Sequence, residues 1–226
     1  MASFVIYGDT KVGKTWLAST APRPVLFIDA EAGGMRHVPG PHVEWDPGGP
    51  PPDMPDDAVC AVTVTTFHDV VQVVQWISQS GLPFKSVVID SVTEAQSRLV
   101  RQIAPSSQPR IQDWGAIGRE LDDAVAQLRD DTHRQGMHCV LVCGLTHDTD
   151  GKAKPMLRGY MRDHLGYKVD IIGCLHRQTD EAGESRRLLQ LVPDAKVQAG
   201  RRDGGALNDW EWDPDLTDLC KRLEGE

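Results

Sequence analysis

Short apolar runs alternate along the chain with glycines, polar stretches and segments of helical period. The apolar runs cover residues 3–7, 24–29, 61–65, 86–90, 139–145, 169–175 and 186–192. The second, fourth and fifth of them are continuously apolar, which is typical of β-strands that are covered on both faces. The pattern therefore predicts a sheet with buried strands.

Two of the intervening segments, 67–80 and 114–130, have the apolar spacing of amphipathic helices. The first stripe consists of Val70, Val71, Val74 and Ile77, and the second of Ile117, Leu121, Val125 and Leu128. Because strand and helix alternate, the sequence predicts an α/β fold in which a mainly parallel, twisted sheet is flanked by helices on both faces.

The segment 39–57 is too rich in proline and glycine to continue either kind of element. We interpret it as a surface excursion within one domain that spans residues 1–226. Its composition fits a solvated loop, and the alternative is a docking site for a partner through Trp45.

A last helix is predicted at about 214–223. Asp213 is the expected N-cap and Pro214 the expected first helical residue. Leucines at the spacing of one helix face indicate that this helix packs on the core.

The composition is that of an ordinary globular protein. The chain has 226 residues, of which 40% are hydrophobic and 25% charged, and its mean hydropathy is −0.36. No apolar run approaches the roughly 20 residues that span a bilayer, and the N-terminus opens directly into a strand without the pattern of a secretion signal. We therefore expect no membrane partner and a cytoplasmic location.

Five cysteines are an odd number without a CxxC spacing, and no HExxH motif occurs. Buried, reduced thiols are the expected state, and the sequence predicts no transition-metal site. The candidate functional residues lie in other motifs of the chain.

The stretch YGDTKVGKT at residues 7–15 fits the spacing GxxxxGK[ST] between a predicted strand and a short helix. In such a phosphate-binding loop, small residues let backbone N–H groups surround phosphate oxygens at a helix N-terminus. Lys14 is expected to reach the β- and γ-phosphates of ATP, and Thr15 to place its hydroxyl on Mg²⁺. The predicted phosphate-binding residues are Gly8, Asp9, Thr10, Lys11, Val12, Gly13, Lys14 and Thr15.

Two further strands end in carboxylates. Asp90 closes the run at 86–90, where a Walker B aspartate holds magnesium, although an aspartate at a strand end can also be a helix N-cap. Asp29 and Glu31 follow the run at 24–29. A carboxylate there can orient and deprotonate the attacking water, and Glu31 is the candidate. The alternative for Glu31 is a charge that satisfies the adjacent turn.

The phrases VIYGDTKVGKT, VLFIDAE, VVIDS and VLVCGLTH, in this order, resemble the RecA-type ATPase core, and specifically the small phage single-strand-annealing recombinases with RecA-like cores. The resemblance covers residues 3 to about 202. It implies a RecA-like P-loop NTPase fold, ATP hydrolysis with Glu31 as the catalytic glutamate, and a γ-phosphate sensor at Thr146 or His147.

The resemblance also implies that single-stranded DNA binds to loops at 104–115 and 148–164. The second loop lies in the stretch 151–202, which holds 11 Lys and Arg against 6 Asp and Glu in a chain whose total net charge is −9. Basic side chains can neutralise phosphates while an aromatic ring stacks on bases, although a solvated basic loop would have the same composition. The candidate residues are Lys152, Lys154, Arg158, Tyr160 and Arg162.

By the same resemblance, a basic residue of one subunit completes the site of its neighbour as an arginine finger. The candidates are Lys196, Arg201 and Arg202, and this function would require a ring or a filament.

The function that these expectations favour is a DNA-stimulated ATPase of phage recombination that anneals or pairs single strands, with a single-strand-binding protein as a further candidate partner. One alternative is another P-loop ATPase of DNA metabolism, such as a helicase loader or motor. Another is an annealing scaffold that nucleotide merely orders. A nucleoside kinase is disfavoured, because no arginine-rich lid motif is evident.

Overall fold

The computed structural model describes residues 1–31, 33, 35, 38–79, 81–105, 108–179 and 183–225. Within these residues, ten strands form one sheet in the order β12-β10-β9-β1-β6-β5-β2-β4-β3, with β11 paired to β9, and β7 and β8 form a separate antiparallel pair. The seven strands from β9 to β3 are parallel to one another, and β10, β11 and β12 are antiparallel additions at one side. The prediction of a mainly parallel α/β sheet is confirmed.

The elements have the following bounds. The strands are β1 (Ser3–Gly8), β2 (Val25–Asp29), β3 (His42–Glu44), β4 (Val59–Thr63), β5 (Ser86–Asp90), β6 (His138–Cys143), β7 (Leu145–His147), β8 (Ala153–Pro155), β9 (Ile171–Thr179), β10 (Ser185–Gln190), β11 (Gly200–Arg201) and β12 (Trp210–Trp212). The helices are α1 (Lys14–Ser19), α2 (Phe67–Ile77), α3 (Val92–Ile103), α4 (Ile111–Arg134), α5 (Met161–His164), the 3₁₀ turn η2 (Leu165–Lys168) and α6 (Leu216–Glu224).

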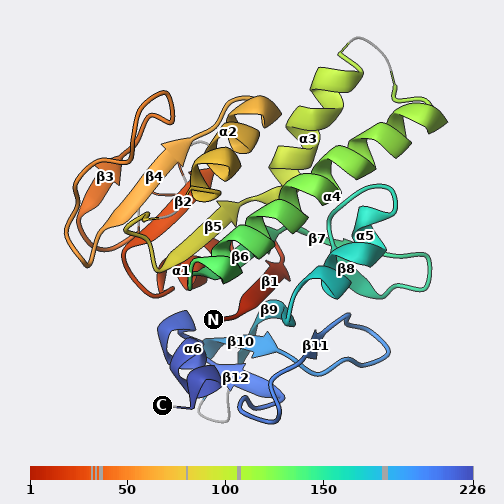
Figure 1. Cartoon of the computed structure of the whole chain (residues 1–226). Helices are drawn as coiled ribbons and strands as arrows, with labels where there is room; N and C mark the ends of the chain where they lie inside the picture. Colours follow the sequence, from red (N-terminus) through yellow and green to blue (C-terminus); the bar gives the residue numbers. More distant parts are fainter. Residues whose placement is uncertain are drawn as a thin grey trace.

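Helices cover the sheet on both faces, as the continuous apolar strands require. Figure 1 shows α2, α3 and α4 together over one face. Alternate residues of the central strands contribute to two apolar clusters, so that in β1 Val5 and Tyr7 join the α2–α4 side, whereas Phe4 and Ile6 join the side of α1 and α6. Within the described ranges, no helix combines the length and the apolar character needed to cross a membrane.

Side-chain caps fix where several helices begin. Thr66 and Asp69 form a reciprocal capping box at the start of α2, and the hydroxyl of Ser91 accepts a hydrogen bond from the amide of Glu94 at the start of α3. Each of these helices therefore starts directly beyond the carboxyl end of a strand.

The prediction for the start of the last helix was wrong by two residues. Asp215, not Asp213, is the N-cap of α6, and its carboxylate accepts from the amide of Asp218. Asp213 instead has a positive φ of 40° and binds the side chain of Arg186 and the amide of Arg187 on β10. The contacts of Asp213 with Arg186 and Arg187 therefore take the place of the N-cap hydrogen bond that the local sequence predicts.

The proline-rich segment is more ordered than its composition indicated. It contains the edge strand β3, which pairs in parallel with β4. Trp45 is only 6% exposed and packs against Trp76 and Phe84, at centroid distances of 6.0 and 6.2 Å. The alternative of a partner contact through Trp45 is therefore wrong, because the ring belongs to the core.

All five cysteines are buried and free, as predicted. The helix expected at 114–130 is longer and begins at Ile111, so part of the expected loop 104–115 is helical; positions 106 and 107 lie outside the described residues.

The end of β1 is packed against β9 so closely that only glycine fits. A Cβ atom on Gly8 would lie 2.2 Å from the carbonyl oxygen of Leu175, which is backbone and cannot rotate away. Gly8 thus lets the strand that leads into the phosphate-binding loop stay in register with its neighbour.

We expect Gly8→Ala to destabilise the ligand-free protein by at least about 1–3 kcal/mol, because overpacking here displaces backbone. Thermal unfolding followed by circular dichroism should show a melting temperature lower by several degrees. Gly49→Ala is the matched control, because a Cβ there meets nothing within 4 Å. Equal melting temperatures for the two variants would contradict this account of Gly8.

Candidate active site

The carboxyl ends of the central parallel strands meet at one edge of the sheet, where α/β folds bind ligands. A cavity of about 510 Å³ opens at this edge. It is lined by Thr10, Lys11, Gly13, Lys14, Thr15, Trp16, Glu31, Val38, Asp90, Thr93, Gly144 and Met156. The structure thus brings Lys14, Thr15, Glu31 and Asp90, which are spread over 77 positions of the sequence, to one cavity.

The loop between β1 and α1 has the backbone of a phosphate cradle. Lys11 and Gly13 have positive φ values of 62° and 105°, which turn successive peptide groups around the loop. The Lys14 ammonium donates hydrogen bonds to the carbonyl oxygens of Gly8 and Asp9, at 3.0 and 2.7 Å, and so lies across the loop. Burial lowers the pKa of Lys14, while nearby carboxylates, Glu31 first among them, oppose this shift.

Two buried carboxylates stand side by side beyond this loop. Asp29 and Asp90 are register partners at the ends of β2 and β5, and each is 4% exposed. Burial raises the pKa of Asp90 to about 6, a hydrogen bond from Thr15 opposes this shift, and the charges of Glu31 and Asp29 add to it. Asp90 is therefore an acid that lacks sufficient cationic compensation from the protein itself.

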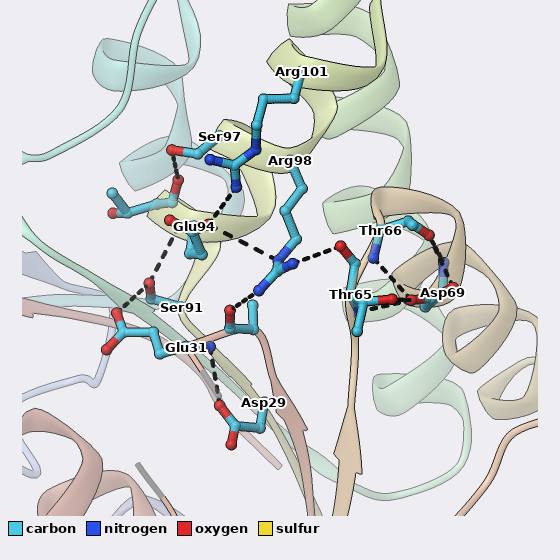
Figure 2. Close-up of polar contacts among 12 residues, drawn as sticks. Asp29, Glu31, Thr65, Thr66, Asp69, Ser91, Glu94, Ser97, Arg98 and Arg101 are labelled. Atoms are coloured by element: carbon cyan, nitrogen blue, oxygen red, sulfur yellow. Dashed lines mark hydrogen bonds and ion pairs between the residues drawn. The ribbon is translucent and has the colours of Figure 1, made fainter. Parts of the chain in front are cut away.

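Glu31 is exposed at the cavity and is held at both its backbone and its side chain. Its amide donates to the carboxylate of Asp29 at 3.0 Å, and its own carboxylate accepts from the hydroxyl of Ser91 at 2.7 Å. Figure 2 shows this Glu31–Ser91 contact beside the first turn of α3. Since Ser91 follows Asp90 directly, the two candidate acids are linked through one residue.

Arg98 is a structural element of this edge that sequence reasoning missed. It projects from α3 and donates to the carbonyl oxygens of Ala30 and Thr65, beyond the ends of β2 and β4, and it lies beside Glu94 (Figure 2). It thereby fixes the backbone directly before Glu31. No local pattern identifies Arg98, because both carbonyl partners are more than 30 residues away in sequence.

The predicted sensor residues do not reach the cavity. After Cys143 the chain leaves the main sheet, and β7 pairs with β8, so that His147 lies opposite Ala153 and is exposed. Among the described residues, the lining of the cavity includes Gly144 from this segment but neither Thr146 nor His147.

Thr93 and Met156 occupy this side of the cavity instead. The Thr93 hydroxyl donates to the carbonyl oxygen of Met156 and accepts from the amide of Gly144, both at 3.0 Å. Sequence reasoning missed Thr93 as a cavity residue, although its position three residues after Asp90 could have indicated it. Met156 comes to the cavity only through the tertiary fold.

The predicted DNA-binding residues fall into two groups. Lys154 forms ion pairs with Asp148 and Asp163, at 3.1 and 2.9 Å, and Arg162 also contacts Asp163, at 3.3 Å, so these charges are already compensated. Arg158 and Tyr160 are exposed, and Lys152 is partly exposed. The segment is not a free loop, because it contains β8 and α5.

Arg158 and Tyr160 lie against α4. The Arg158 guanidinium lies 5.9 Å from the ring centroid of Trp114, and the Tyr160 ring covers Gly118, where a Cβ atom would lie 2.3 Å from it. These two side chains form a cationic and aromatic surface close in sequence to Met156, which lines the cavity.

Two of the three finger candidates are engaged within the chain. Arg201 forms ion pairs with Asp203 and Asp209, and Arg202 donates to the carbonyl oxygen of Tyr167. Arg201 ends β11, which pairs with the start of β9 at the opposite edge of the sheet from the phosphate-binding loop, and Arg202 follows it. Lys196 is exposed, and no ion pair of its side chain occurs among the described residues.

The donor set fits a nucleoside triphosphate with magnesium. Loop amides and the Lys14 ammonium suit phosphate oxygens, and the Thr15 hydroxyl and the Asp90 carboxylate, the latter through water, are oxygen donors of the kind that Mg²⁺ prefers. A cation would also compensate the buried Asp90 carboxylate, whose pKa is raised mainly by burial.

Comparison with protein families agrees with this geometry. A family model described as an AAA domain matches residues 1–202. The chain belongs to this AAA domain family. The match spans the phosphate-binding loop, both strand-end acids and the segment that carries Met156, so the cavity is that of a P-loop ATPase domain.

A search of solved structures found, among others, a KaiC-like protein, PH0186, from the hyperthermophilic archaeon Pyrococcus horikoshii OT3. The two chains share 15% sequence identity and align with a TM-score of 0.46 over 84% of this chain and 77% of that chain. A search of curated proteins gave no match.

We expect Asp90→Asn to become more stabilising, relative to the wild type, as the pH rises from 5 to 8 in buffer with EDTA. The folded-state pKa of Asp90 is raised from 3.8 to about 6, so ionisation costs folding free energy through this range, and asparagine does not ionise. The expected change is on the order of 1 kcal/mol or more in the difference between their free energies of unfolding. Urea titrations at the two pH values measure it.

Asp53→Asn, on the exposed segment before β4, is the control for the loss of one carboxylate. A stability difference between Asp90→Asn and the wild type that stays constant from pH 5 to 8 would contradict the role of burial.

Proposed function

We propose that this chain is a magnesium-dependent ATPase that couples ATP hydrolysis to the binding of single-stranded DNA. The observation that supports hydrolysis is the convergence of Lys14, Thr15, Glu31 and Asp90 on one cavity of this AAA domain. A cation, a hydroxyl and two carboxylates from three strand ends are the groups that phosphoryl transfer requires.

Each residue has a role that follows from its position. Lys14 binds the β- and γ-phosphates, and Thr15 and Asp90 hold the metal ion. Magnesium bound there would offset the charge that develops on the phosphates in the transition state. Glu31 accepts a proton from the attacking water and orients it, while Asp29, Ser91 and Arg98 keep the Glu31 segment in place.

A rigid path connects the cavity with the cationic surface. Gln96, on α3, is buried. Its side chain accepts a hydrogen bond from the backbone amide of Arg158 at 2.8 Å and donates one to the carbonyl oxygen of Arg158 at 3.0 Å. Together with the Thr93–Met156 bond, this clasp holds residues 156–158 against the helix that follows Asp90. A change at the cavity would therefore move Arg158, which supports coupling to a ligand on that surface.

The composition of this surface favours single-stranded nucleic acid as the ligand. Arg158, Trp114 and Tyr160 combine a guanidinium with aromatic rings, a combination that binds backbone phosphates and stacks on bases without sequence preference. Annealing or pairing of DNA strands in phage recombination, in a ring or filament with Lys196 as the remaining candidate finger, is the finer function that the sequence resemblance favours.

Two alternatives share the same cavity. A helicase loader or motor would hydrolyse ATP with another macromolecular partner, and an annealing scaffold would bind nucleotide without hydrolysing it. The following experiments distinguish them.

We expect Lys14→Ala to abolish ATP binding, because it removes the phosphate-binding cation, and Glu31→Gln to retain binding while lowering the turnover rate by at least about a hundredfold, because a general base contributes 10²–10⁴-fold. Calorimetry measures binding and phosphate release measures turnover, both with magnesium. A Glu31→Gln variant with wild-type turnover would exclude Glu31 as the base, and a wild type that binds ATP but does not hydrolyse it would favour the scaffold.

We expect Tyr160→Ala to weaken binding of a fluorescent oligonucleotide by about tenfold, because one base stack contributes on the order of 1–3 kcal/mol. Arg158→Ala should also weaken binding and reduce its salt dependence, because one phosphate contact is lost. Tyr160→Phe, which keeps the ring, and Lys221→Ala, which removes an exposed charge on α6, should bind as the wild type does. Fluorescence anisotropy at two salt concentrations measures these effects, and wild-type affinity of both alanine variants would exclude this surface.

A further inference from the structure

An arginine from the distant strand β10 lies against the phosphate-binding loop. The Arg187 guanidinium is 3.6 Å from the ring centroid of Trp16, the residue that follows Thr15. Two of its side-chain atoms, Cδ and Nη1, lie 3.2 and 3.3 Å from where a Cβ atom on Gly13 would be. Gly13 therefore provides both the positive φ of the loop and the space for Arg187.

The charge of Arg187 lacks a dedicated partner. Over the part of the chain that the structure describes, its guanidinium forms no ion pair or hydrogen bond. Directly opposite it on β9 is Arg177, a like charge whose proximity is unfavourable in a cross-strand pair. Asp213 is the nearby carboxylate, but it already binds the Nε atom of Arg186 at 2.6 Å.

Arg186 shows what a compensated arginine on the same strand looks like. It pairs with Asp213 and lies 5.6 Å from the ring centroid of Trp212. Because neighbouring side chains of a strand point to opposite faces, Arg186 is directed away from the phosphate-binding loop and Arg187 toward it. Arg187, whose charge is not compensated, is thus the arginine that faces the phosphate-binding loop.

Arg187 does not line the cavity itself, but Trp16 and Gly13, against which its side chain lies, both do. A cation–π contact with the Trp16 ring leaves the N–H donors of the guanidinium available to an acceptor. An arginine in this arrangement binds phosphate oxygens through two parallel hydrogen bonds. Burial and the charge of Arg177 also lower the pKa of Arg187, as expected of a cation that an anion would stabilise.

We propose that Arg187 is a second phosphate-binding cation of this site, which contacts the phosphate chain of a bound nucleoside di- or triphosphate from the Trp16 side. Strand β10 thereby becomes part of the nucleotide site, and Trp16 holds the guanidinium at its rim. This inference rests on the proposed ATP binding at Lys14.

The test compares Arg187→Gln, which keeps much of the side chain without its charge, with Arg186→Gln, which removes the neighbouring charge on the other face. Competition against a fluorescent ADP analogue measures the affinity of ATP, of ADP and of inorganic tripolyphosphate, which has no base. We expect Arg187→Gln to weaken all three by about tenfold, as for loss of a charge-assisted hydrogen bond, and Arg186→Gln to match the wild type.

Equal affinities of Arg187→Gln and Arg186→Gln for ATP would overturn the proposal. It would also be overturned if Arg187→Gln lost affinity for ATP but not for tripolyphosphate, because Arg187 would then act on the base. Arg187→Lys, which keeps the charge, should recover part of the tripolyphosphate affinity, whereas a purely structural role would leave it as low as in Arg187→Gln. A wild type that binds none of the three would instead refute the nucleotide site itself.

Discussion

The parallel pairing of β2 with β5 places two buried carboxylates next to each other, and the chemistry of the site depends on this constraint. Asp29 and Asp90 are register partners with almost no exposed surface, so neither charge is screened by water. The carboxylate of Asp29 is stabilised within the protein, because it accepts hydrogen bonds from the backbone amides of Glu31 and Gly33. For Asp90, a hydrogen bond from Thr15 and the charge of Lys14 oppose the rise in its pKa that burial causes. A cation bound at the end of β5 would therefore stabilise the Asp90 carboxylate, and the phosphate-binding loop lies beside this strand end.

The helix that follows Asp90 transmits this arrangement in two directions. Toward one side, Ser91 and Arg98 hold Glu31 and the carbonyl oxygen of Ala30. Toward the other, Thr93 and Gln96 bind the backbone of Met156 and Arg158. One helix thus lies between the candidate base and the cationic surface, so the proposed coupling of nucleotide to a second ligand would need no long-range rearrangement.

Basic residues in this chain are informative only when their partners are known. Lys154, Arg201 and Arg202 stand out in the sequence, yet carboxylates or a carbonyl group within the chain already satisfy them. Arg187 attracts no notice in the sequence, and it is the guanidinium that lies uncompensated against the loop. A count of charges along a segment measures its net field but not which side chains are free to bind a ligand.

The sequence by itself determined the strands β1, β2, β4, β5, β6, β9 and β10, their mainly parallel arrangement, the phosphate-binding loop and the two strand-end acids, but not the short strands β3, β7, β8, β11 and β12. These features are local, because apolar runs, glycine spacing and an acid after a strand depend on neighbouring residues. The helix start at Asp215, the burial of Trp45 and the displacement of His147 from the cavity were decided by tertiary structure. Each depends on a partner distant in sequence: Arg186 and Arg187 draw Asp213 away from the cap, Trp76 and Phe84 enclose Trp45, and β8 draws β7 out of the main sheet. Met156 lines the cavity, and Arg98 and Arg187 lie beside it, for the same reason, since only the packing of remote segments brings their side chains there.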